Sequence, residues 1–168
     1  MYEKQPLMEV WVKSASLKGS HIVLCGSCIP DESIAEITVD NMQNVVLSVC
    51  LENIHQNIVC SKVSTIVKAV QPKLISILTV DGSPHCLELH SLAERAKFIT
   101  NTSIPFRHFV IVDERVLHVS SEATVLCRYL HLLEEIIKKE PHIKELITKQ
   151  SLEQQDKTKR SGAREGVE

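Results

Sequence analysis

The stretch that decides the fold is the nearly uninterrupted apolar run Leu74-Ile75-Ser76-Ile77-Leu78-Thr79-Val80. Apolar runs of this length, rich in β-branched residues, are typical of strands that helices cover on both faces. The run is followed by the turn Asp81-Gly82 and then by Ser83-Pro84, in which Ser can cap a helix and Pro can occupy its first position. The stretch therefore predicts one strand–turn–helix unit of a parallel sheet.

The same alternation extends in both directions along the chain. Residues 21–25 and 45–50 form two earlier apolar runs, and each is followed by a helical pattern, the first reaching about residue 37 and the second ending at Pro72. A short strand is also predicted at residues 9–12. Asn53 is the predicted cap of the second helix.

The end of the chain departs from this alternation. Residues 109–112 predict a fourth strand that turns into a hairpin partner at residues 116–119. Ser121 is the predicted cap of a long last helix, which Pro141 interrupts, and residues 143–147 could form one more short helical turn. Together these elements predict an α/β fold: a single three-layer domain with a mostly parallel sheet, flavodoxin- or Rossmann-like, with a C-terminal hairpin and long helix.

Length and composition set limits on the class of protein. The 168 residues suit one domain, predicted at residues 1–150, followed by a disordered polar tail at residues 151–168. A net charge of -2 and 4% aromatic residues argue against binding nucleic acid. The chain has neither an apolar run long enough to span a membrane nor a signal peptide, so we expect a cytoplasmic protein.

Cysteines follow the predicted strands. Cys25 ends the first clear strand and Cys28 follows it, Cys50 ends the second, and Cys86 comes after the third. Right-handed crossovers place every strand-to-helix loop at the same edge of a parallel sheet. We therefore expect these four thiols to gather at the carboxyl edge. Cys60, like Cys127, falls in an apolar helix stripe and is predicted to be a core residue.

The chemistry of this group follows from its sulfur content. Two thiolates spaced as in Cys25-Gly26-Ser27-Cys28 can bind one metal, and thiolates near helix starts are expected to have a lowered pKa. The candidate ligands are mainly the thiols of Cys25, Cys28, Cys50 and Cys86, and a 4Fe–4S cluster is favoured because it is bound by sulfur ligands. Zinc is the alternative, with His85 or His90 replacing one ligand. Neither a phosphate-binding loop nor a nucleophile elbow occurs.

Residues 21 to 90 resemble the iron–sulfur small subunit of nickel–iron hydrogenases and respiratory complex I. The resemblance implies a flavodoxin-like domain with a 4Fe–4S cluster at its carboxyl edge. Cys25 and Cys28 would match the first ligand pair and Cys86 a later ligand. This chain lacks that family's final Cys-Pro ligand motif.

Three functions follow as hypotheses. The leading one is a cytoplasmic metal or redox protein that serves a protein partner or redox enzyme. The second is a thiol-dependent enzyme in which Cys86 is the nucleophile, with His85 and Asp81 as further catalytic candidates. The third is a non-catalytic binding or regulatory subunit, whose hairpin and last helix supply a surface for a partner or for homo-oligomer formation.

Overall fold

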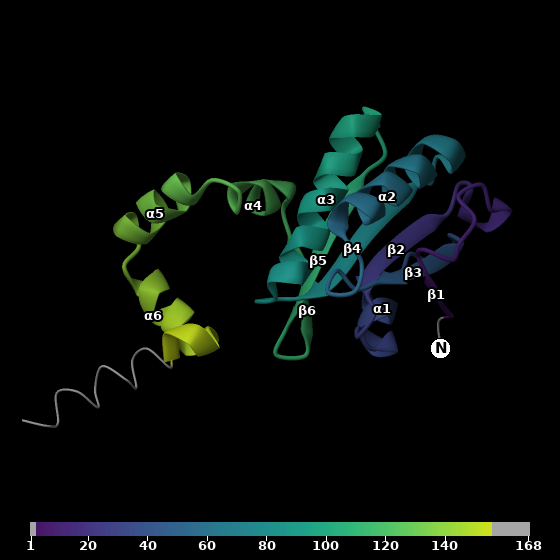
Figure 1. Ribbon diagram of the computed structural model, residues 1–168. Helices are drawn as coiled ribbons and strands as arrows, with labels where there is room; N and C mark the ends of the chain where they lie inside the picture. Colours follow the sequence, from purple (N-terminus) through teal and green to yellow (C-terminus); the bar gives the residue numbers. More distant parts are fainter. Residues whose placement is uncertain (1–2, 156–168) are drawn as a thin grey trace, which may run out of the picture. The chain divides into compact units, whose positions relative to one another are not determined.

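The computed structural model describes residues 3–155 and contains one six-stranded sheet. Its strand order is β1-β3-β2-β4-β5-β6, in which all neighbouring strands are parallel except β5 and β6. The mostly parallel sheet and its C-terminal hairpin confirm the predicted fold class (Figure 1). The strands are β1 (Lys4–Pro6), β2 (His21–Gly26), β3 (Asn44–Val49), β4 (Leu74–Val80), β5 (Phe106–Val112) and β6 (Arg115–Val119).

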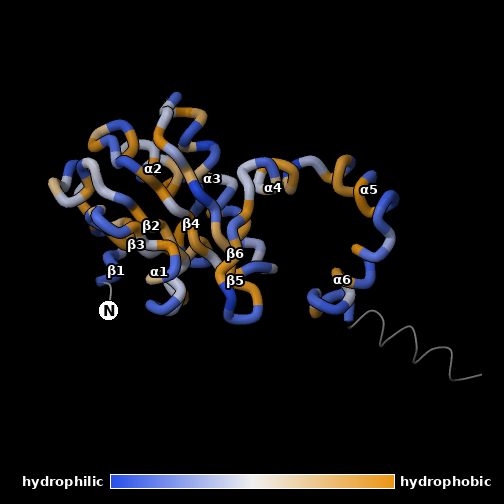
Figure 2. The backbone as a smooth tube through the Cα atoms, turned by 180° about the vertical axis from the view of Figure 1, so that it is seen from behind, coloured by the Kyte–Doolittle hydropathy of each residue, from blue (hydrophilic) through white to orange (hydrophobic). Residues whose placement is uncertain are grey.

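Helices cover both faces of the sheet, but unequally. The larger core lies where Ile66 of α2 and Leu92 of α3 meet strand residues such as Leu24. The smaller core lies on the other face, where Ile34 of α1 meets Val23. The strands between these layers are the most continuously apolar part of the chain (Figure 2). The helices of this part are the 3-10 turn η1 (Ala15–Leu17), α1 (Asp31–Ile37), α2 (Gln56–Val70) and α3 (Pro84–Thr100).

The chain divides into two compact units, residues 1–125 and residues 126–168. The first contains the whole sheet and the helices packed on it. The second contains α5 (Leu130–Lys139) and α6 (His142–Gln150), both wholly within the described residues and both without a buried side chain. Helix α4 (Ser121–Leu126) ends at the boundary.

The predicted long helix between Ser121 and Pro141 is two short ones, α4 and α5. The backbone N–H of Tyr129 donates to the carbonyl of Leu126, a tight turn that ends α4. Pro141 interrupts the helix as predicted, because it has no N–H with which to continue α5, and the short helical turn predicted at residues 143–147 lies in α6. Ser120 and not Ser121 caps α4, because the Ser120 hydroxyl accepts a hydrogen bond from the N–H of Ala123.

Three other local predictions also need correction. The first strand lies at β1 and not at residues 9–12, because the chain turns away from the sheet where the N–H of Glu9 bonds Pro6. His55 and not Asn53 caps α2, since its imidazole accepts from Asn57 N–H. Cys127 is exposed and not a core residue, whereas Cys60 is buried as predicted.

Two further predictions concern the polar tail and membrane-spanning segments. Residues 152–155 of the expected polar tail are helical, and residues 156–168 lie outside the described part of the chain. No helix among the described residues is long and apolar enough to cross a membrane.

Candidate functional site

The carboxyl edge of the sheet is where the predicted cysteines were expected to meet. Strands β2, β3 and β4 run parallel and end at Gly26, Val49 and Val80, so the loops that follow them all leave from this edge. The chain passes from β2 to β3 on one side and then crosses to β4 on the other, which makes the β2–β4 junction the topological switch point. Ligands of open α/β sheets bind in the crevice at such a point.

A tight turn follows β2 and holds the first cysteine pair. The N–H of Ile29 donates to the carbonyl of Gly26 at 3.1 Å, which folds the loop back on the strand end. The Cys28 thiol therefore lies over Gly26, 3.8 Å from where a β-carbon at that position would be. Cys25 is fully buried on the α1 face of the sheet, whereas Cys28 is exposed. One loop thus carries one hidden thiol and one accessible thiol.

Charged groups from two other elements surround this loop. The Lys4 ammonium of β1 donates to the Ile29 carbonyl and forms an ion pair with Asp31 of α1 at 3.2 Å. Burial raises the pKa of the Cys25 thiol to about 12; the Lys4 charge opposes this rise, while Cys28 and Asp31 add to it. The neutral thiol is therefore the resting form of Cys25, with a cation close by.

Cys86 and its neighbours occupy the loop after β4. Ser83 caps α3 by accepting from the N–H of Cys86 at 3.4 Å, as the sequence predicts. Cys86 is half-buried, and the neighbouring His85 turns to Glu52 in the loop after β3, 3.5 Å away. The exposed Asp81 donates its backbone N–H to Ile111, and this bond ties the turn to β5. His85 is thus directed to Glu52 and not to the adjacent thiol.

The edge brings these cysteines to one side of the sheet without assembling a ligand set. Cys50 is half-buried in the loop after β3, and all six cysteines are free thiols. Within residues 3–155, no three His, Cys, Asp or Glu side chains are grouped so that they could hold a metal ion. The fully buried Cys25 would have to turn out of its apolar surroundings to become a ligand. The arrangement fits two-thiol chemistry better than a cluster that needs four sulfur ligands.

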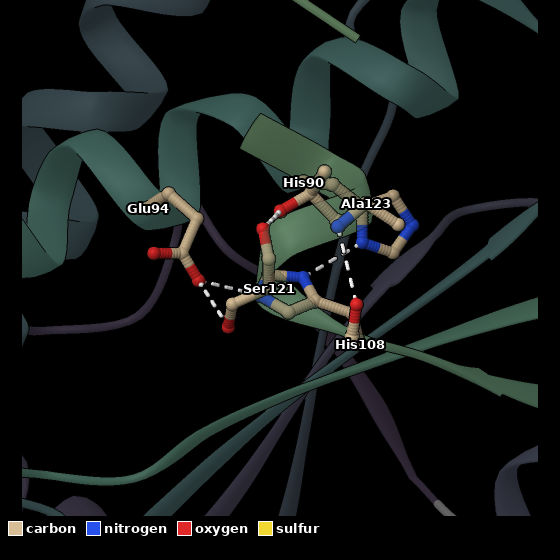
Figure 3. Close-up of polar contacts among 7 residues, drawn as sticks. His90, Glu94, His108, Ser121 and Ala123 are labelled. Carbon is tan, nitrogen blue, oxygen red and sulfur yellow. Dashed lines mark hydrogen bonds and ion pairs between the residues drawn. The ribbon is translucent and has the colours of Figure 1, made fainter. Parts of the chain in front are cut away.

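A second polar cluster is buried between α3, β4 and β5, and sequence reasoning missed it. His90 and His108 join their Nδ1 atoms at 2.9 Å, and His90 Nε2 bonds the Thr79 hydroxyl at 2.8 Å. His108 Nε2 lies 2.7 Å from Glu94, which also accepts from the Ser121 hydroxyl at 3.0 Å (Figure 3). The cluster is a continuous chain of hydrogen bonds from the surface end at Glu94 to the sheet.

The direction of each bond in this chain follows from its carboxylate end. Ionised Glu94 can only accept, so His108 donates through Nε2 and, when neutral, accepts at Nδ1. His90 must then donate through Nδ1 and accept from Thr79 at Nε2. Burial lowers the pKa of both histidines, that of His90 to about 3, and so favours these neutral forms. Every polar group of the cluster thus has a partner, and the hydrogen bonds hold α3 against β4 and β5.

His90 is consequently not available as a base for Cys86. The sequence signal for the buried cluster is the pair His90 and Glu94, which are four residues apart and border the apolar stripe of α3. A similar tie lies at the start of β2, where His21 bonds Asn44 at 2.7 Å and Ser76 at 2.8 Å. Burial also lowers the pKa of His21.

A groove of about 710 Å³ between α2 and α3 lies apart from both clusters. Its walls come from the bodies of these helices and not from the loops at the carboxyl edge, and they include Ser64, Lys68 and Arg95. Lys68 is already engaged with the carbonyl of Thr100 at 2.9 Å. The groove is therefore not part of the cysteine site.

The layers, the strand order and the switch point define an α/β protein of the doubly wound type. The family model of a Rossmann-like domain matches residues 14–165, and the chain belongs to that family. No curated protein and no solved structure gave a significant match. The family supplies the fold, and the chemistry has to be argued from the site.

Proposed function

We propose that this chain is a cytoplasmic cysteine-based redox protein in which Cys25 and Cys28 cycle between a dithiol and a disulfide. The observation that carries the proposal is the pairing of a buried thiol with an exposed one on the same turn at the switch point. In a reducing compartment such a pair forms a transient disulfide and not a structural one. A redox-active protein partner or a small oxidant would supply the other half of the reaction.

The two thiols have different accessibility and so different parts to play. Exposed Cys28 would react first, as a thiolate that attacks one sulfur of a partner disulfide and releases the partner's other sulfur as a thiolate. Buried Cys25 would then lose its proton to that leaving thiolate and attack Cys28, forming the Cys25–Cys28 bond and freeing the partner's remaining sulfur. The partner gains two electrons and this chain loses two, so the exchange is balanced.

Lys4 supports the second step. Its ammonium opposes the rise that burial causes in the pKa of Cys25, and so makes the Cys25 thiolate easier to form than burial alone would allow. The ion pair with Asp31 and the bond to the Ile29 carbonyl hold the ammonium beside the turn. We assign Lys4 as a positioning residue that assists Cys25 and does not itself contact the oxidant.

Iron–sulfur binding through Cys25, Cys28, Cys50 and Cys86 remains a separate prediction, as does zinc binding. The position of the loops at one edge favours it, and the burial of Cys25 opposes it. Reconstitution with iron and sulfide under anaerobic conditions distinguishes the two functions. Visible absorbance with four irons bound per chain would support the cluster and argue against a free dithiol.

The direct test of the dithiol is a thiol count after mild oxidation. We expect one equivalent of oxidised glutathione to remove two of the free thiols, and peptide mass spectrometry to find them joined as Cys25–Cys28. Cys25→Ser should instead accumulate a glutathione adduct on Cys28, because the resolving thiol is absent. Cys28→Ser should react slowly and form no internal disulfide.

Cys127→Ser is the matched control, since Cys127 is also exposed but has no assigned part in the chemistry. It should leave the Cys25–Cys28 disulfide unchanged. If the wild type formed only glutathione adducts, or if Cys25→Ser accumulated no more adduct on Cys28 than the wild type, the proposed dithiol function would be wrong.

A further inference from the structure

Glu52 and His85 meet across the end of β2. Strand β2 lies between β3 and β4, so the loops that follow these two strands flank the cysteine turn. Glu52 comes from the loop after β3 and His85 from the first turn of α3, after β4, and their side chains are 3.5 Å apart. Helices α2 and α3 pack on one face of the sheet and α1 on the other. The exposed Cys28 therefore has this contact on one side and the start of α1 on the other.

The three loops around the cysteine turn carry carboxylates and neither lysine nor arginine. Residues 27–32, 50–55 and 81–85 contain the acids Asp31, Glu32, Glu52 and Asp81, and their other ionisable side chains are thiols and two histidines. Glu32, Glu52 and Asp81 are exposed. The nearby cation Lys4 does not offset these three, because its ammonium is already paired with Asp31 at 3.2 Å. The surroundings of the accessible thiol are therefore negatively charged.

These charges act on any molecule that approaches Cys28. Neighbouring strands of a sheet are about 4.8 Å apart, and the screening length at physiological ionic strength is about 8 Å. The loops after β3 and β4 are therefore close enough to influence a reaction in the loop between them. Charge of one sign around a site raises the local concentration of oppositely charged partners and lowers that of like-charged ones. The acids are not themselves a binding site; they determine which disulfides reach the thiol.

We propose that the Cys25–Cys28 pair exchanges with cationic disulfides, in which ammonium or guanidinium groups flank the sulfurs, and discriminates against anionic ones. This inference rests on the proposed dithiol function and names its substrate class. The Cys28 thiolate attacks one sulfur of the cationic disulfide and releases the other as a thiolate. Cys25 then gives its proton to that thiolate and displaces the second fragment as the internal disulfide forms, so that two electrons pass to the substrate.

The test compares three small disulfides on the full chain at low salt and about pH 8, where free imidazoles are neutral. Cystamine carries two ammonium groups, hydroxyethyl disulfide is neutral, and dithiodiglycolate carries two carboxylates. Each rate of internal disulfide formation is divided by the rate of the same compound with the neutral thiol N-acetylcysteinamide, because this ratio removes differences in leaving-group reactivity. We expect the ratio for cystamine to exceed that for dithiodiglycolate about tenfold, and the excess to shrink as salt is raised to about 0.5 M.

Peptide disulfides distinguish a small cation from a basic segment of a protein. Two symmetric peptide disulfides are compared in the same way, one with lysines and one with glutamates beside the cysteine. The lysine peptide should react faster than the glutamate peptide. A larger preference between the peptides than between the small disulfides would identify a basic protein segment as the source of the substrate, and an equal or smaller one would identify a small cation.

Charge variants assign the preference to the loops around the turn. Glu32→Gln with Glu52→Gln should reduce the cystamine preference to about threefold or less. The matched control, Asp40→Asn with Glu122→Gln, removes two exposed acids that precede β3 and follow β6, at the opposite edge of the sheet, and should keep the preference. Circular dichroism checks that both variants keep their helix content.

The outcomes separate this inference from the function on which it rests. Equal normalised rates for the three small disulfides would overturn the substrate class while leaving the dithiol function intact. A preference that survives in Glu32→Gln with Glu52→Gln, or that is lost in the control variant, would also overturn it. If mixed disulfides accumulated and no internal disulfide formed with any of the compounds, the dithiol function itself would be wrong.

Discussion

Three buried histidines predict that the folded state loses stability as the pH falls below neutral. His21, His90 and His108 are at most 2% exposed, and burial lowers the pKa of each below the usual 6.5. The unfolded chain therefore binds more protons than the folded chain in the range below about pH 6.5. The stabilisation is complete above that pH and is lost progressively as the pH falls toward the folded-state pKa values.

The size of the effect can be worked out for His90. With a folded-state pKa of about 3 and an unfolded value of 6.5, lowering the pH from about 7.5 to about 5 costs about 2 kcal/mol of the unfolding free energy. His21 and His108 add to this loss in the same direction. At the lower end of the range each neutral histidine contributes a slope of up to about 1.4 kcal/mol per pH unit.

Urea denaturation at a series of pH values measures this slope. His90→Gln should lower the slope below about pH 6 by the equivalent of about one proton. NMR titration of the wild type provides a check that does not depend on a variant. A His90 ring that gained its proton above about pH 5, or a slope identical in His90→Gln, would refute the reasoning.

Three further predictions concern stability, each measured as the free energy of unfolding in urea. Glu94→Ala should cost about 1–3 kcal/mol, because the buried His108 Nε2–H loses its acceptor; a loss within error would show that water replaces the carboxylate. Leu92→Ala should cost about 2–5 kcal/mol by opening a cavity under α3, whereas Ile58→Ala, at an exposed position on α2, should cost about 0.5 kcal/mol or less. Equal losses in the two variants would contradict the assigned core. Gln71→Gly should stabilise the chain by about 0.5–1 kcal/mol, since Gln71 ends α2 with a left-handed φ of 47°; destabilisation would mean that the glutamine side chain contributes more than its backbone strain costs.

The sheet was predictable because its central strands are apolar on both faces. The run at residues 74–80 and the turn that follows specify a covered strand and a helix start by local chemistry alone. The cysteines after three separate strands could be assigned to one edge because crossovers between parallel strands place every strand-to-helix loop at the same edge of the sheet. The hairpin at the end of the sheet was similarly visible in the short turn between two β-rich runs.

The exposure of each cysteine was not predictable. Residues alternate between the faces of a strand, so Cys25 shares the α1 face with Val23, but both faces of β2 are buried and the pattern does not distinguish them. Whether a strand-end thiol points inward depends on how far α1 covers that face. That depends on the path of the loop and on Lys4, which lies 21 residues earlier in the chain.

The buried histidine cluster could not be predicted from the sequence for a related reason. His90 and His108 are 18 residues apart, on a helix and on a strand, and either one alone resembles an ordinary exposed histidine. They form a hydrogen-bonded pair because α3 packs against β5, and this contact is a matter of tertiary packing that local sequence does not specify. The break between α4 and α5 likewise depends on the backbone turn near Tyr129, which apolar spacing does not indicate.

The three-residue edge strand β1 has a practical consequence for handling the protein. Among the described residues its one neighbour in the sheet is β3, and Lys4 within it is the cation that acts on the Cys25 thiol. A fusion tag or a deletion that displaces residues 4–6 would therefore change thiol reactivity more than 20 positions downstream while sparing most of the hydrophobic core. Reactivity measured on a chain tagged at that end would report the tag as well as the protein.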